Sequence, residues 1–62
     1  MGPAKLKFRV LYEGESSKEF IVHISKDQDE ADGMMMAIRA GKAENPYSPL
    51  KSVHFNGVVY DD

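Results

Sequence analysis

The 62-residue chain contains no cysteine. It can therefore have no disulfide framework and no thiolate metal site, and we expect a cytoplasmic protein. No apolar run approaches about 18 residues, so we expect no transmembrane helix and no membrane partner. Residues 1–5 lead directly into a charged segment, which argues against a secretory signal peptide. A basic excess is also missing, because the formal net charge is −2, and this disfavours a dedicated nucleic-acid binder.

Catalytic and metal-binding motifs are missing as well. The length predicts a single small domain, residues 1–62, with little room for a deep pocket and its supporting residues. The serines occupy predicted turn, loop or strand positions, and no glycine-rich phosphate loop is present. An acidic cluster at 27–32 lacks the ligand spacing and central glycine of a calcium loop, and helix capping explains it. We therefore expect no enzyme activity, no cofactor and no metal site.

Two segments near the start alternate apolar and polar residues. Residues 5–13 carry Leu6, Phe8, Val10 and Tyr12 on one face, and residues 19–25 repeat the pattern with Phe20, Val22 and Ile24. A period of two is typical of a half-buried strand. The short, glycine-containing segment 13–17 between them predicts an antiparallel hairpin.

A helix is predicted from about Gln28 to Ala40. Asp27 with Glu30 fits a capping box, and Ser25 with Gln28 is a second candidate. Gly41 suits the left-handed residue that commonly follows a helix. We expect Gly33 to allow close approach of the helix to the sheet.

The helix residues expected to face the sheet follow the i, i+3, i+4, i+7 spacing of an amphipathic helix. They are Ala31, Met34, Met35 and Ile38. Met36 then falls at the flank or in solvent. In the following loop, Tyr47 stands between Pro46 and Pro49, and we expect it to pack over the end of the helix rather than to be displayed as an anchor.

The last apolar segment allows two interpretations. Residues 50–55 form a strand, and Asn56-Gly57 is a strong hairpin signal. However, the segment that follows is short, so a glycine bulge within one continuous strand is slightly favoured.

These elements predict an α+β fold in which one helix covers one face of a three-stranded, mainly antiparallel sheet. The element order is strand–strand–helix–strand, with a possible extra C-terminal hairpin strand. The third strand can lie beside the first, in order 2-1-3, or beside the second, in order 1-2-3. We favour the first order, because an antiparallel sheet tolerates one wet face.

The uncovered face is the first candidate interaction surface. It is predicted to carry Lys5, Lys7, Arg9, Leu11, Ile21, His23, Ser52, His54 and Val58, with Tyr60 as a further candidate. His23 and His54 could face each other across strands there. The residues predicted to contact a partner are Lys7, Arg9, Leu11, Ile21, His23 and His54. A second candidate is an acidic surface formed by the helix start, Glu13, Glu15, Asp61 and Asp62.

The layout resembles that of small bacteriophage proteins that bind and inhibit a host enzyme. This similarity concerns arrangement alone and transfers no functional residue. The expected function is a non-enzymatic protein-binding module, acting as an inhibitor or regulator from a phage or mobile element. The alternative is a small nucleic-acid-binding regulator that uses Lys5, Lys7, Arg9 and Lys51. A monomer and a homodimer through an edge strand or the open face are both compatible with the sequence.

Overall fold

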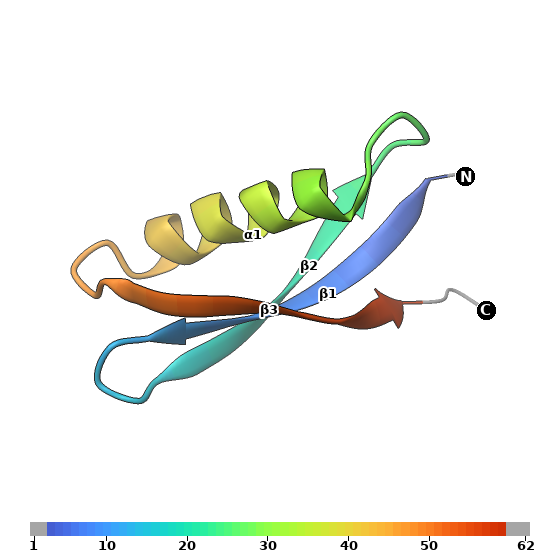
Figure 1. The fold of residues 1–62 in the computed structure, drawn as a ribbon. Helices are drawn as coiled ribbons and strands as arrows, with labels where there is room; N and C mark the ends of the chain where they lie inside the picture. Colours follow the sequence, from blue (N-terminus) through green and yellow to red (C-terminus); the bar gives the residue numbers. More distant parts are fainter. Residues whose placement is uncertain (1–2, 60–62) are drawn as a thin grey trace.

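A computed structural model describes residues 3–59 of the chain. The described elements are β1 (Ala4–Tyr12), β2 (Ser17–Ile24), α1 (Glu30–Glu44) and β3 (Leu50–Val59). The strands form an antiparallel sheet in the order β2-β1-β3, and α1 crosses one face of it (Figure 1). The predicted α+β fold and the favoured strand order are therefore confirmed.

The hydrophobic core lies between α1 and the even-numbered side of the two N-terminal strands. Phe8 and Val10 are completely buried, and the buried core also includes Leu6, Tyr12, Val22, Ile24 and Ala37. Phe55 of β3 extends this packing, because its ring lies edge-on to Phe8 with 5.6 Å between centroids. The period-two pattern thus identified the covered face of the sheet correctly.

The helix begins one residue after Asp29, later than predicted. Asp29 and Asp32 form the capping box, in which each carboxylate accepts a hydrogen bond from the backbone N–H of the other at 3.1 Å. The predicted box of Asp27 with Glu30 was wrong. Ser25 and Gln28 instead close the preceding turn, where the Ser25 N–H donates to Gln28 Oε1 at 2.9 Å.

The helix also continues past Gly41, the residue predicted to end it. Gly41 is buried inside α1, and its carbonyl accepts a 2.7 Å hydrogen bond from the Tyr12 hydroxyl of β1. The helix ends at Glu44, and Asn45 caps it in a non-helical conformation because Pro46 follows and disfavours helical geometry in the residue before it.

The predicted apolar stripe is confirmed only in part, because small residues form the closest contact with the sheet and Met34 of the stripe packs beside them. Gly33, Ala37 and Gly41 are the buried residues of α1, whereas Ala31 is exposed and Met35 is 56% exposed. A Cβ on Gly33 would lie 2.9 Å from Leu6 Cδ1, so the expected close approach at this glycine is confirmed. Because the helix backbone lies so near the sheet, larger side chains can only flank the contact.

Methionines and a partly buried isoleucine supply those flanks. Met34 and Met36 pack against the core from the side, as expected for Met36, and Ile38 is half-buried. Tyr47 is 95% exposed, so its predicted packing over the helix end was wrong. The Tyr47 side chain instead points into solvent, which agrees with the alternative that it is displayed.

The last strand is continuous, which confirms the bulge. Leu6 pairs with Val58 and Phe8 with Phe55, so Asn56 and Gly57 lie opposite a single β1 residue. Gly57 has a φ of +107°, a conformation that glycine adopts without steric penalty. A second register shift lies between Leu11 and Tyr12.

Candidate functional site

The sheet face turned away from α1 carries side chains from all three strands; we call it the open face. Strand register places every predicted partner-contacting residue on it. Its described members are Lys5, Lys7, Arg9, Leu11, Ser17, Glu19, Ile21, His23, Ser52, His54, Asn56 and Val59. None of these residues is buried.

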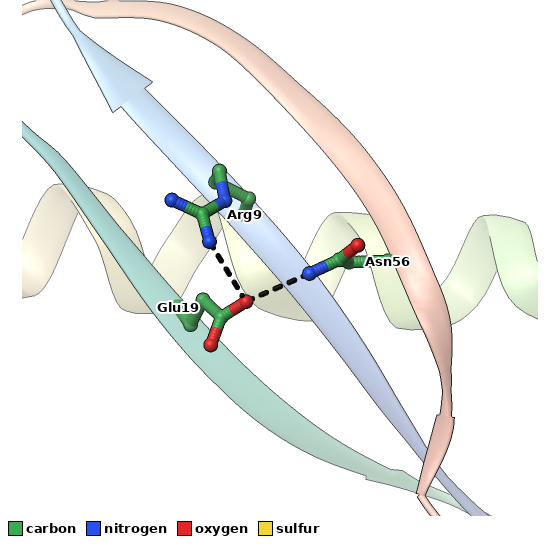
Figure 2. A network of polar contacts seen from close by, with 3 residues as sticks. All are labelled: Arg9, Glu19 and Asn56. Atoms are coloured by element: carbon green, nitrogen blue, oxygen red, sulfur yellow. Dashed lines mark hydrogen bonds and ion pairs between the residues drawn. The ribbon is translucent and has the colours of Figure 1, made fainter.

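A polar network crosses the middle of the open face (Figure 2). Glu19 Oε2 of β2 accepts a hydrogen bond from Arg9 Nη2 of β1 at 3.1 Å and one from Asn56 Nδ2 of β3 at 2.7 Å. One carboxylate oxygen therefore connects all three strands. The Arg9 and Glu19 side chains are 48% and 39% exposed, so water screens their attraction.

Sequence reasoning selected Arg9 as a partner contact but missed Glu19 and Asn56. Glu19 is two residues from Ile21 and therefore lies on the same face of β2. Together with the hairpin register, this spacing could have predicted that Glu19 lies opposite Arg9. Asn56 gave no such signal, because its contact depends on the bulge. In the folded protein Arg9 is paired with Glu19, whereas Lys7 lies directly across from the apolar Ile21.

The apolar side chains of this face lie on both sides of the network. Ile21 is 51% exposed and neighbours Lys7, whereas Leu11 is half-buried near the other end of β1. Val58 does not join them. It pairs with Leu6 and so lies on the helix side, because the bulge shifts its register.

The two histidines share the open face but do not face each other. β1 separates their strands, with His23 opposite Lys5 and His54 opposite Arg9. His54 Nε2 lies 3.0 Å from Ser52 Oγ on its own strand. Residues 3–59 hold no group of three or more histidine and acidic side chains that could bind a metal ion.

The predicted acidic surface is divided in the fold. The turn with Glu13 and Glu15 and the acidic first turn of α1 lie at opposite ends of the molecule (Figure 1). They separate because β2 carries the chain back along the full hairpin before the helix begins. Asp61 and Asp62, like Tyr60, lie outside the described residues.

The positive charges are divided too. Lys51 lies in the second register shift of β3, opposite Leu11 and Tyr12. It lines a shallow surface hollow together with Glu13 and Glu15. It is thus distant along the sheet from Lys5 and Lys7. The described phenylalanines all lie on the helix side of the sheet, through Phe8 and its register partners Phe20 and Phe55.

Comparisons with protein-family models, curated protein sequences and solved structures gave no match for this chain. Among the described residues, α1 is too short and too polar to cross a membrane, and no other helix is present there.

Proposed function

We propose that the protein is a non-enzymatic binding module that acts by occupying a surface of a larger protein. The observation that supports this most strongly is the open face, a whole side of the sheet without a covering layer. An inhibitor or regulator of this kind needs no reactive group. It needs only a stable surface that matches its partner.

The composition of the open face indicates the chemistry of that partner. Ile21 and Leu11 offer two apolar contacts, and Lys7 provides a positive charge beside the first. The fitting surface has apolar side chains flanked by carboxylates. The bonds of Glu19 to Arg9 and Asn56 reduce the freedom of the side chains between these contacts, which lowers the entropy lost on binding.

Nucleic-acid binding remains the alternative, and the arrangement of charges gives it less support. Lys51 lies beside two acidic residues, and Arg9 is paired with Glu19. Single-strand binders of the sheet type stack bases on exposed aromatic rings. The described open face carries no phenylalanine, tyrosine or tryptophan, and its only aromatic rings are the imidazoles of His23 and His54.

The test compares capture of partners by two double variants. Lys7→Glu with Leu11→Ser alters the open face, and Arg39→Glu with Met35→Ser makes matching changes at exposed positions of α1. Each tagged protein is incubated with cell lysate, with and without nuclease. We expect the helix variant to retain a protein partner after nuclease treatment and the open-face variant to lose it.

Equal capture by both variants would show that the open face is not the binding surface. Loss of the captured protein after nuclease, with recovery of nucleic acid and a steep decrease of affinity with salt, would instead support the alternative.

A further inference from the structure

The two edges of the sheet differ in regularity. β3 is interrupted by two register shifts, whereas β2 pairs with β1 without a shift from Ala4–Ile24 to Leu11–Ser17. Bulges, prolines and charged side chains are the usual means by which proteins prevent an edge strand from pairing with another chain. β2 contains no bulge and no proline, and its charged Lys18 and Glu19 are already paired within the fold, so its edge can accept a further strand.

The register also shows which backbone groups of β2 point outward. The Tyr12 N–H donates to the Ser16 carbonyl at 2.8 Å, which identifies these residues as a hydrogen-bonded pair. Bonded and non-bonded pairs alternate in an antiparallel ladder. The even-numbered residues of β2 therefore bond to β1, and Glu19, Ile21 and His23 direct their N–H and C=O groups away from it.

This outward-facing segment has a defined end. The next outward residue is Ser25, whose N–H donates to Gln28 Oε1 and whose carbonyl accepts the Gln28 N–H. The turn before α1 thus satisfies the Ser25 backbone groups. Ser17 also faces outward, but in a pairing centred on Ile21 it would meet Ser25, whose backbone groups are already bonded. Residues 19–23 are therefore the stretch that an added strand uses in that register.

We propose that a second copy of this chain occupies the edge, with β2 pairing antiparallel to β2 around Ile21. Residues opposite each other across such a pair lie on the same face. On the open face, Ile21 then meets Ile21 of the second copy, and Glu19 meets His23 of the second copy on both sides of the axis. On the helix side, Phe20 meets Val22 of the second copy.

The side chains select this register over its neighbours. Centring on Glu19 would place two carboxylates directly opposite each other, and centring on Phe20 would place Glu19 against Ile21. Centring on His23 would direct Ile21 to Ser25, whose backbone groups are already bonded. Centring on Ile21 pairs an exposed apolar side chain with itself and forms about six main-chain hydrogen bonds.

The pairing is compatible with the polar network of the open face. Arg9 and Asn56 both donate to Oε2 of Glu19, and Oε1 accepts no hydrogen bond from the described residues. It can accept one from the histidine of the second copy. The dimer would carry two open faces on one side of a continuous sheet, a consequence that does not depend on the function proposed above.

Because the chain has no cysteine, single cysteine substitutions can report the register. Opposed residues of a bonded pair have Cα atoms about 5.5 Å apart, within the range that a disulfide spans. We expect Ile21→Cys to form a covalent dimer rapidly under mild oxidation. Glu19→Cys and His23→Cys should each remain largely monomeric alone and crosslink when mixed. Met35→Cys, at a similarly exposed position of α1, provides the background rate.

Two crosslinking results would overturn the proposal. The first is that the Ile21→Cys variant crosslinks no faster than the Met35→Cys variant. The second is that the Glu19→Cys variant crosslinks with itself as readily as it does with the His23→Cys variant, because the proposed register keeps the two copies of position 19 on opposite sides of the axis.

Association of the unmodified protein is measured by sedimentation equilibrium, without any partner. The mass should rise from 6.9 kDa towards twice that value with concentration. Ile21→Lys places two ammonium groups across the axis and should weaken association at least about tenfold, whereas Met35→Lys should not. A protein that stays monomeric up to about 1 mM would also contradict the proposal.

Discussion

The two faces of the sheet are formed by the same strands but differ in the burial of their side chains. On the helix side, Phe8 and Val10 are fully buried, and the helix backbone lies so close that glycine occupies two of its contact positions. On the open face, none of the described residues is buried, and the most prominent contact is the solvent-exposed bridge from Glu19. Alternation along β1 therefore separates the residues that stabilise the fold from those that are available for binding.

Truncation of Phe8, a completely buried aromatic side chain, should have the largest effect on stability. Phe8→Ala removes a ring in contact with both α1 and Phe55, and such substitutions cost about 3–5 kcal/mol. A domain of this length has a total stability of roughly 3–9 kcal/mol, so we expect the variant to be largely unfolded or close to it. Urea denaturation followed by far-UV circular dichroism measures the change.

The matched substitution on the open face is Ile21→Ala. It lies on the neighbouring strand and is 51% exposed, so the free energy of unfolding should change by only about 0.5 kcal/mol. Similar losses for Phe8→Ala and Ile21→Ala would contradict the division of roles between the faces.

A loss of stability smaller than that of Phe8→Ala is expected for a substitution where the helix contacts the sheet. In Gly41→Ala the new Cβ would lie 3.0 Å from Val10 Cγ1, and Val10 is a branched, fully buried side chain that has little room to move. Overpacking should exceed the gain in helix propensity and reduce the free energy of unfolding by about 1–2 kcal/mol. Lys42→Ala, at the exposed neighbouring position, should leave it nearly unchanged.

Urea denaturation of the Gly41→Ala and Lys42→Ala variants measures the change in the free energy of unfolding. If Gly41→Ala instead raised stability by about 1 kcal/mol, as at a solvent-exposed helix glycine, the close contact with Val10 would be wrong.

The strand pattern carried most of the information about this fold. Alternation in residues 5–13 gave the covered and open faces, and the short tail after Asn56-Gly57 favoured the bulge over a hairpin. The centre of the helix face was predicted only in part, because Gly33 and Gly41 have no side chain to add to an apolar period. Their importance follows from the nearness of Leu6 and Val10, which only packing creates.

The candidate site was predicted in part for the same reason. The alternation along each strand placed Lys7, Arg9 and Ile21 on one face, but it could not show which charged side chains form ion pairs there. The contact of Asn56 with Glu19 requires both the strand order and the bulge. The displayed position of Tyr47 depends on how the chain turns after α1, which its two flanking prolines do not determine.

A similarly small effect should come from breaking the bridge on the open face. A double-mutant cycle of Arg9→Ala and Glu19→Gln measures the coupling of the ion pair, while the amide of the second variant can still accept from Asn56. Because both side chains are partly exposed, water screens the pair, and we expect a coupling of about 0.3–1 kcal/mol that decreases in high salt. A coupling of about 3 kcal/mol, unaffected by salt, would mean that this face helps to hold the fold together. In that case the residues of the open face would not be available for binding alone, and the contrast with the covered face would weaken accordingly.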